Sequence, residues 1–235
     1  MVSLGEGTSG AYILTASHAL YQSDGTQRPG CEFEPFQSPG ARVPIVRVGA
    51  ERPAEANEAG DRAIAELGTN ATLRRMGRSI DQTVLPLEVE VLDSSPSSRV
   101  ADGDVVDPSL RHVGYFPKAF DNGPDFGVSS NCRIFNHDSY ADSAVNSDSV
   151  KHSCTTERGT SGGGLIRVGE GRPKVVCINS GSVNEVGLAD GSSFSRYRNF
   201  NYCRPITASF MDQARQFARG SVVGDSTPAT RSRTN

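Results

Sequence analysis

Two short motifs far apart in the chain carry residue types that can act together in acyl transfer. In the first, residues 159–163 (GTSGG), Ser161 lies on a glycine-rich turn. Such a turn can expose the serine Oγ while nearby backbone N–H groups point the same way, which supplies a nucleophile and an anion-stabilising pocket together. The second motif, residues 14–18 (LTASH), is an apolar, β-prone run that ends in His18, a candidate general base. The pair predicts acyl-transfer chemistry.

The order of the motifs along the chain separates two kinds of serine hydrolase. The GTSGG string also fits the nucleophile elbow of α/β-hydrolases, in which the catalytic histidine follows the serine. All four histidines of this chain precede Ser161: His18, His112, His137 and His152. An α/β-hydrolase arrangement would therefore have no base. The order histidine, acid, serine favours a chymotrypsin-like arrangement.

The acid that orients the histidine should lie between His18 and Ser161, at the start of a buried strand. Asp61 fits this position best, because the short apolar stretch of residues 63–67 (AIAEL) follows it. Other aspartates compete on chain order alone, but none precedes so suitable a run: Asp24, Asp81, Asp93, Asp102 and Asp104. We therefore predict that Asp61 is the acid.

These motifs, in this order and at this spacing, resemble those of the chymotrypsin-like serine peptidases. Residues 13–18 (ILTASH) resemble the histidine motif of that family, residues 61–64 (DRAI) the aspartate motif and residues 159–163 the serine motif. Three further segments are most similar to its trypsin-like and V8-like bacterial branch: 114–117 (GYFP), 131–134 (NCRI) and 152–156 (HSCTT). The resemblance covers about residues 8–217.

The resemblance implies a serine endopeptidase with a defined role for each group. Ser161 would attack the scissile carbonyl, His18 would take its proton and later protonate the leaving amine, and Asp61 would fix the imidazole tautomer. The backbone N–H groups of Gly159 and Ser161 would form the oxyanion hole. The implied substrate is a polypeptide, with no cofactor and no metal ion.

Two positions depart from the family pattern. Many members carry an aspartate immediately before the nucleophile, where it pairs with a freshly cut N-terminus, but this chain has Thr160 there. Activation by such an ion pair is therefore not expected. Ala19 follows His18, so the disulfide often found beside the catalytic histidine is also absent.

Residues expected to contact the substrate come from two segments. Thr155 and Thr156, six and five residues before Ser161, should form part of the wall of the first pocket. The strand expected at residues 174–182 returns beside it, and its edge can pair with an extended substrate. Its predicted contact residues are Asn179, Ser180, Gly181 and Ser182. No aspartate lies at the pocket base, and Asn179 stands where glutamate-specific relatives place a histidine, so we expect a polar, uncharged pocket.

The pattern of short β-type runs predicts an all-β fold, and the family resemblance implies two six-stranded antiparallel β-barrels followed by a C-terminal helix. The chain has 235 residues, enough for one two-barrel unit, and its 25 glycines and 13 prolines predict frequent turns. Strand-like runs occur at residues 11–14, 42–48, 83–92 and 174–178. The expected helix spans residues 206–218, with Thr207 as its cap, Gly220 beyond its end, and Phe210, Met211, Ala214 and Phe217 on one face.

The expected organisation places the site between two halves. Residues 1–100 form a barrel that carries His18 and Asp61, residues 101–220 form a barrel that carries Ser161 and the helix, and residues 221–235 are a disordered tail. The active site would lie in the cleft between the barrels. Residues 1–10 are short for the opening strands of such a barrel, so we expect the first barrel to be abbreviated or truncated at its start.

Charge and cysteine usage narrow the function classes. The net charge is −3 with no sustained basic block, which disfavours nucleic-acid binding, and no apolar run approaches the ~20 residues that span a bilayer. There is no C-x-x-C pair to favour a zinc site. Cys132 and Cys154 flank the loop that leads to the nucleophile, and we predict a disulfide between them. The odd count of five cysteines leaves at least one thiol free or paired between chains.

Two functions from different classes follow. The first is an active serine endopeptidase. An esterase that acts on small acyl substrates is a variant of this function, because the same acyl-enzyme chemistry serves both. The second is a catalytically impaired protease-like domain that binds polypeptide. A disulfide and the resemblance together indicate a secreted or periplasmic monomer, although no signal peptide is visible in the chain.

Overall fold

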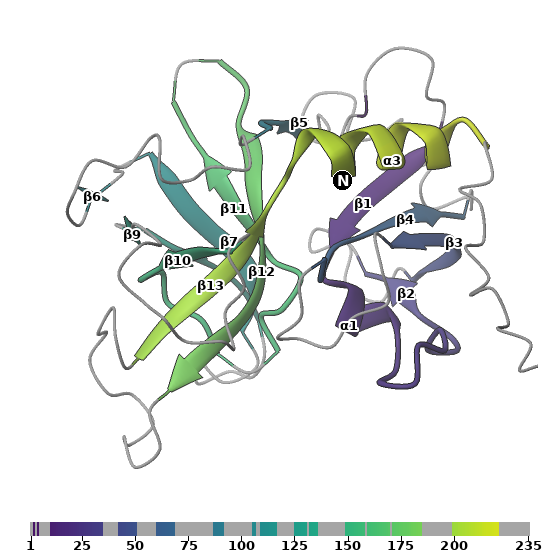
Figure 1. Ribbon diagram of the computed structural model, residues 1–235, viewed down its shortest axis with the longest axis horizontal. Helices are drawn as coiled ribbons and strands as arrows, with labels where there is room; N and C mark the ends of the chain where they lie inside the picture. Colours follow the sequence, from purple (N-terminus) through teal and green to yellow (C-terminus); the bar gives the residue numbers. More distant parts are fainter. Residues whose placement is uncertain are drawn as a thin grey trace, which may run out of the picture.

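Two β-sheets lie side by side, and a C-terminal helix crosses the first of them (Figure 1). The computed structural model describes Val2, Leu4 and these ranges: 10–34, 42–50, 60–68, 87–91, 105–106, 109–116, 125–130, 132–135, 149–157, 159–169, 171–184 and 199–220. Within that part of the chain the fold is mostly β, as the sequence predicts.

The first sheet carries the histidine and aspartate motifs on two neighbouring strands. It has four strands in the order β1-β4-β3-β2, and every neighbouring pair is antiparallel. The strands are β1 (Ala11–Thr15), β2 (Glu32–Phe33), β3 (Val43–Ala50) and β4 (Ala63–Leu67), with the short helix α1 (Ser17–Leu20) after β1. Alanine, isoleucine and leucine occupy most of β4, and this strand is buried between its two neighbours.

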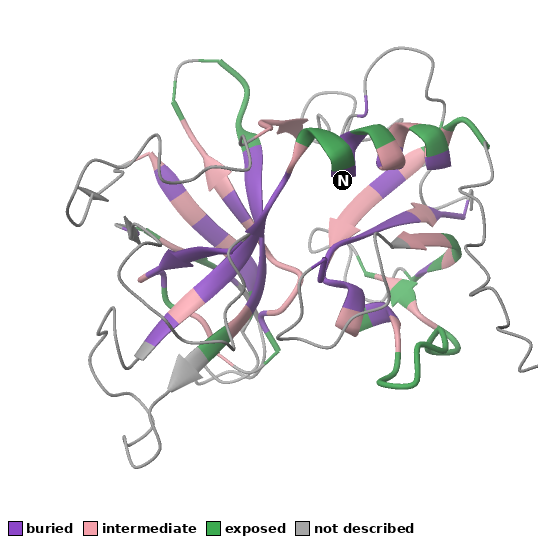
Figure 2. Ribbon diagram, viewed as in Figure 1, coloured by how far each residue is buried: buried purple, intermediate pink, exposed green. Residues whose placement is uncertain are grey.

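The second sheet carries the serine motif. Its nine strands follow the order β6-β9-β10-β13-β12-β11-β7-β8, and β5 pairs with β12 off this path. They are β5 (Glu88–Val89), β6 (Val105–Val106), β7 (Leu110–Phe116), β8 (Asp125–Ser129), β9 (Arg133–Phe135), β10 (Val150–His152), β11 (Gly164–Arg167), β12 (Lys174–Asn184) and β13 (Asn199–Pro205). The central strands β12 and β13 are largely buried (Figure 2).

Helix α3 (Ala208–Ala218) joins the two halves through one apolar core. Thr207 Oγ1 accepts a hydrogen bond from Phe210 N at 3.2 Å, which caps the helix, and Gly220 has a positive φ of 73° just beyond its end. The predicted apolar face is buried against residues of both sheets: Phe210, Met211, Ala214 and Phe217 pack with Val2, Leu4, Tyr12, Ala16, Ile64, Val175, Ile178 and Ile206. The helix prediction is confirmed.

The strand expected at residues 83–92 differs from the prediction. Of the described residues in this range, only β5 is a strand, and it pairs with β12 of the second sheet. This pairing is parallel, so the expectation of purely antiparallel sheets is wrong at this strand. The alternating residues Leu87, Val89 and Val91 do pack against the core, as their spacing indicates. Residues 83–86 and residue 92 lie outside the described residues.

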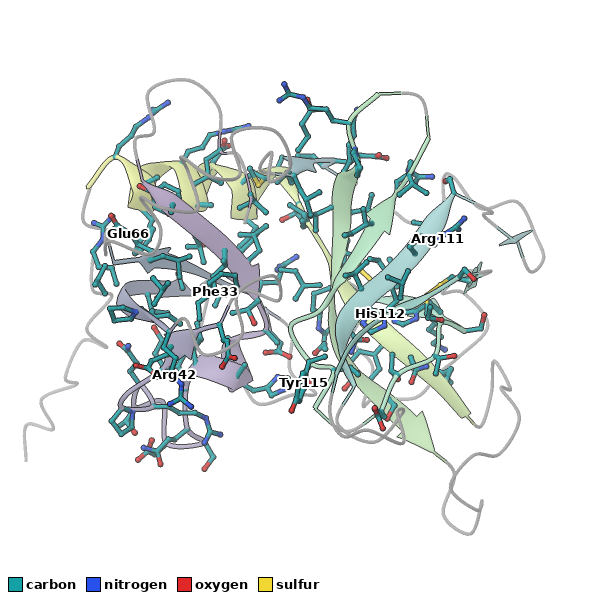
Figure 3. The ribbon with its side chains drawn as sticks, turned by 180° about the vertical axis from the view of Figure 1, so that it is seen from behind. Phe33, Arg42, Glu66, Arg111, His112 and Tyr115 are labelled. Atoms are coloured by element: carbon teal, nitrogen blue, oxygen red, sulfur yellow. A yellow bond between two sulfur atoms is a disulfide. The ribbon has the colours of Figure 1, made fainter. Side chains whose placement is uncertain are left out.

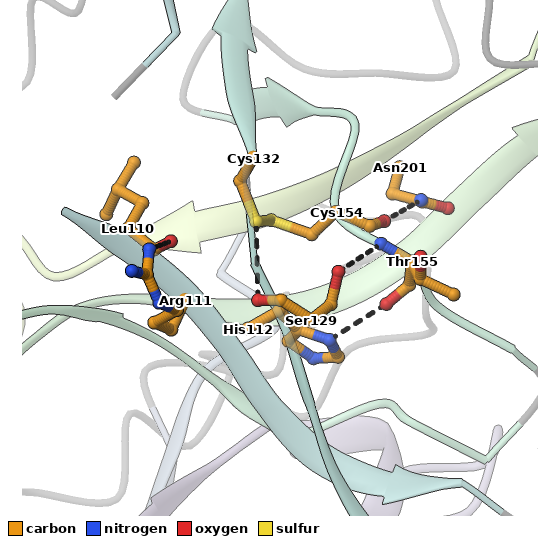
Figure 4. Close-up of a disulfide and its surroundings, with 8 residues drawn as sticks. All are labelled: Leu110, Arg111, His112, Ser129, Cys132, Cys154, Thr155 and Asn201. Carbon is orange, nitrogen blue, oxygen red and sulfur yellow. Dashed lines mark hydrogen bonds between the residues drawn. A yellow bond between two sulfur atoms is a disulfide. The ribbon is translucent and has the colours of Figure 1, made fainter. Parts of the chain in front are cut away.

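Two disulfides lie in the second sheet and its loops. The predicted bond between Cys132 and Cys154 is confirmed (Figure 4). A second disulfide, which the sequence analysis did not predict, joins Cys177 of β12 to Cys203 of β13. This disulfide can be predicted only when the register of β12 against β13 is known. In that register Cys203 lies opposite Asn179, two residues along β12 from Cys177. Cys31 is a free thiol.

Neither α1 nor α3, the helices in the part of the chain that the structure describes, has the length and apolar character needed to span a bilayer.

Candidate active site

His18 projects from a tight turn at the end of β1. Strand β1 stops at Thr15, and hydrogen bonds from Ala19 N to Ala16 O (3.2 Å) and from Tyr21 N to Ser17 O (2.9 Å) close the helical turn α1. The expectation that His18 lies on a β-prone run is therefore wrong, because the strand ends at Thr15 and His18 lies in the helical turn that follows. The neighbouring residues Ala16 and Ser17 are fully buried, whereas the His18 side chain is 23% exposed. The fold thus fixes the backbone and presents the imidazole.

Asp61 lies directly before β4 and is fully buried. Its Oδ2 lies 2.8 Å from His18 Nδ1, and its Oδ1 accepts hydrogen bonds from His18 N (3.0 Å) and Ser17 Oγ (2.9 Å). Ser180 Oγ of β12 donates to Oδ2. By contrast, Asp24 is solvent-exposed and bonded to Thr26. Among the described aspartates, Asp61 is the one that meets the histidine.

The environment of Asp61 keeps it ionised. Burial raises the pKa of the carboxyl group, but hydrogen bonds from His18 and Ser180 and the charge of His18 outweigh burial, so the pKa is lower than its usual value. An ionised carboxylate opposite Nδ1 favours the tautomer that carries its proton there. The Nε2 atom of His18 is then the basic nitrogen.

The serine turn packs directly on the histidine motif. It connects β10 to β11, and Gly159 and Gly162 have φ values of 105° and 87°, a region that favours glycine. A Cβ on Gly162 would overlap Thr15 Oγ1 and lie 3.3 Å from Ala16 N. The serine turn therefore packs against the end of β1 at Gly162, where there is no room for a side chain.

Ser180 links the serine to the aspartate. Ser161 Oγ donates a hydrogen bond to Ser180 O at 3.3 Å, and the hydroxyl of the same Ser180 donates to Asp61. Within the described residues, the recorded partner of Ser161 Oγ is thus a backbone carbonyl of β12 and not the His18 ring. In structures without a ligand, catalytic hydrogen bonds are often long and tighten only when substrate binds.

The backbone N–H groups of the turn fall into two sets among the described residues, those with an acceptor and those without one. The N–H groups of Thr160, Gly162 and Gly163 donate to Glu157 O, Asn179 O and Thr160 O. For Gly159 and Ser161, no acceptor occurs among the described residues. These are the two groups predicted to form the oxyanion hole.

The residues predicted to contact the substrate fall into two groups. Thr155 is exposed and Thr156 half-buried in the loop after Cys154, and Thr155 N is held by Ser129 Oγ at 2.8 Å (Figure 4). Gly181 and Ser182 continue β12 beyond the turn, where Ser182 is exposed.

Asn179 and Ser180 are buried, and their side chains bond to Thr160 and Asp61. Their side chains therefore support the site from inside the protein.

Sequence reasoning missed Tyr202 on β13. Its ring is fully buried, and a Cβ on Gly181 would lie 2.5 Å from its hydroxyl oxygen. Burial raises the pKa of Tyr202 to about 12, so the hydroxyl stays protonated, and it hydrogen-bonds with Ser180. No motif marks this residue in the sequence, because its place depends on the pairing of β13 with β12.

The other described histidines are fully buried, and their pKa values are low. His112 of β7 is buried, unlike Tyr115 on the same strand, which is half exposed (Figure 3). Burial lowers the pKa of His112 to about 4, although its hydrogen bond with Thr155 O opposes this. Burial and the neighbouring His112 lower the pKa of His152 to about 3. His137 lies outside the described residues.

These two imidazoles predict acid sensitivity. In the unfolded chain they bind protons near pH 6.5, whereas the folded chain keeps them neutral down to about pH 4 and about pH 3. The unfolded state then binds more protons in this window, so the free energy of unfolding falls as the pH is lowered from 6.5 towards 4. His152→Gln should reduce this slope by about one proton, roughly 1.4 kcal/mol per pH unit, in urea unfolding.

Val150→Ala is the matched control, because it removes buried volume from the same strand without removing a titrating group. If the free energy of unfolding of His152→Gln changes with pH as steeply as that of the unmodified protein, the buried His152 does not cause the acid sensitivity.

Gly162→Ala should damage both stability and activity. A positive φ costs an alanine about 1–2 kcal/mol, and the new Cβ must also displace Thr15. A shift of the turn by about 1 Å is expected to lower kcat about a hundredfold. Gly171→Ala is the control, because Gly171 has a similar φ of 94° but nothing within 4 Å of its Cβ position. Equal kcat values for the two variants would show that the contact with Thr15 does not position the turn.

Comparison with solved structures identifies the fold. The chain is similar to the protease Anisep from Arthrobacter nicotinovorans (TM-score 0.54, 14% identity, 91% of this chain and 87% of that chain). It is also similar to a Glu endopeptidase in complex with MPD (0.55, 12%, 93% and 88%) and to the thermostable serine protease AL20 from an extremophilic microorganism (0.52, 14%, 92% and 88%). No family model and no curated protein matches the sequence. The chain therefore has the fold of the chymotrypsin-like serine proteases.

Proposed function

We propose that the protein is a serine endopeptidase that hydrolyses peptide bonds through Ser161, His18 and Asp61. One observation carries the proposal: a buried, ionised Asp61 binds His18 Nδ1 at 2.8 Å, and the turn that carries Ser161 packs on the strand end directly before that histidine. The fold shared with serine proteases supports it.

The proposed reaction has two half-reactions. Ser161 Oγ attacks the carbonyl carbon of the peptide while its proton passes to His18 Nε2, and the N–H groups of Gly159 and Ser161 stabilise the oxyanion. The C–N bond then breaks as Nε2 returns the proton to the leaving amine. Water attacks the resulting ester in the same way, with His18 again as the base, and releases Ser161 and the acid product.

The β12 strand offers an edge for an extended substrate. Its residues beyond Asn179 pair with β13 on one side, and the pairing with β11 ends at Ile178. No other described strand pairs with the residues of β12 beyond Asn179. A polypeptide bound there as an added strand would place its scissile bond near the serine. Thr155, Thr156 and Ser182 would give the first pocket a polar, uncharged wall.

The two disulfides support an oxidising location for this enzyme. Disulfides persist outside the cytosol in most organisms, and both bonds here are buried in the second half of the protein. We infer that the protein acts as a secreted or periplasmic monomer.

A peptide-library digest tests the proposed function. Purified protein is incubated with a mixture of synthetic peptides, and new ends are identified by mass spectrometry, with Ser161→Ala as the control. Cleavage that depends on Ser161 is expected. Peptide binding without any cleavage by the unmodified protein would favour the alternative, a catalytically impaired binding domain. Cleavage of small esters alone would identify an esterase.

A further inference from the structure

We propose that Asn179 is a positioning residue that locks the serine turn in its working geometry. The inference rests on the proposed function and extends it, because the side chain expected to contact substrate holds the turn from behind. Asn179 lies on β12 and is 1% exposed, so its side chain has almost no surface to offer a substrate.

Asn179 binds the turn through both its backbone and its side chain. Gly162 N donates to Asn179 O at 2.8 Å, and Asn179 N donates to Gly163 O at 2.8 Å. The side-chain Nδ2 lies 3.2 Å from Thr160 O and 3.2 Å from Thr160 Oγ1. Residues on both sides of Ser161 are therefore attached to one residue of a central strand.

Thr160 completes this arrangement without any charge. Its hydroxyl donates to Glu157 O at 2.8 Å and its N–H to the same carbonyl at 3.0 Å, while its Oγ1 accepts from Asn179. Thr160 is 2% exposed. The position before the nucleophile is thus held by neutral hydrogen bonds, where an ion pair with an N-terminus would need a carboxylate.

The carboxamide of Asn179 suits this position for a chemical reason. Its Nδ2 carries two hydrogens, so it can donate to the carbonyl and the hydroxyl of Thr160 at once. An ionised aspartate has a similar shape but no hydrogen-bond donor. Its negative charge would lie close to the carbonyl oxygen of Thr160. Alanine removes both side-chain bonds and leaves the two backbone bonds in place. The two variants therefore separate the side-chain lock from the strand pairing.

The first test follows amide hydrogen exchange in Asn179→Ala by NMR. The N–H groups of Thr160 and Gly163 should exchange about tenfold faster, the effect of losing one or two hydrogen bonds that hold the turn. Amides of the β11–β12 ladder, such as that of Leu165, should keep their rates. This measurement needs no substrate, so it tests the lock whether or not the chain hydrolyses peptides.

The matched control is Val176→Ala. Val176 lies on the same strand, is 1% exposed and belongs to the core rather than to the contacts of the turn. Its loss should speed the exchange of ladder and turn amides together. If Asn179→Ala behaves in the same way as Val176→Ala, Asn179 is an ordinary structural residue and the proposal is overturned.

The second test divides kcat from KM. Asn179→Ala should lower kcat about a hundredfold and leave KM for a peptide substrate within about threefold, because the turn and not the binding edge is disturbed. Val176→Ala should keep kcat near that of the unmodified protein at a temperature where both are folded. Asn179→Asp should lower kcat at least as much as Asn179→Ala.

A loosened turn with unchanged kcat would overturn the catalytic part of the proposal. An increase in the KM of Asn179→Ala with no change in kcat would indicate that Asn179 binds substrate. Failure of the unmodified protein to cleave any peptide would count against the proposed function, whereas the exchange data would still decide whether Asn179 locks the turn.

Discussion

Replacing His18 by alanine is expected to lower kcat about 10⁶-fold, with little change in KM. The variant loses the proposed base. The buried carboxylate of Asp61 still accepts hydrogen bonds from Ser17 and Ser180. Removal of a triad histidine has an effect of about this size because the serine hydroxyl alone is a weak nucleophile. Steady-state hydrolysis of a peptide found in the library digest measures the change.

A double variant sharpens this prediction. If Ser161 and His18 act as one unit, His18→Ala combined with Ser161→Ala should leave the same residual rate as Ser161→Ala alone. A residual rate far below that of either single variant would mean that the two residues act independently. That result would contradict the assignment of His18 as the base for Ser161.

Asp61→Asn is expected to lower kcat about 10⁴-fold. The amide is similar in size to the carboxylate, so the buried site keeps its volume. However, the amide holds His18 in the wrong tautomer or turns an N–H group towards the donors of Ser17 and Ser180. The pH dependence of kcat/KM and urea unfolding separate the loss of chemistry from a loss of stability.

Ser180→Ala provides the graded control for Asp61. It removes one of the recorded donors to the carboxylate and leaves the hydrogen bond to His18 Nδ1 intact. We expect a decrease in kcat of about tenfold, well below that of Asp61→Asn. Similar losses in the two variants would indicate that both act by unfolding the loop before β4.

Local sequence signals were enough to predict the candidate site residues and several elements. Ser161 is marked by the glycines around it, and the positive φ values of Gly159 and Gly162 explain why those glycines are there. Asp61 is marked by the apolar run of β4, which is buried as expected. Helix α3 follows from its cap and its apolar face. Each of these features depends on residues close together in the chain.

Features that depend on strand register could not be predicted in the same way. The parallel pairing of β5 with β12, the disulfide of Cys177 with Cys203 and the contact of Tyr202 with Ser180 all join distant segments. A shift of one residue along a strand exchanges the two faces of the sheet, and the sequence alone does not fix that choice. Asn179 was expected to contact substrate for this reason, although its amide is bonded to Thr160 on the buried side.

The most direct measurement for the proposed mechanism is active-site labelling with a fluorophosphonate, followed by mass spectrometry of the adduct. We expect stoichiometric labelling of Ser161, no labelling in Ser161→Ala, and labelling slowed by orders of magnitude in His18→Ala. Circular dichroism confirms that each protein is folded before the probe is added. A folded, unmodified protein that takes up no label, or takes it up at another residue, would contradict the claim that Ser161 is an activated nucleophile.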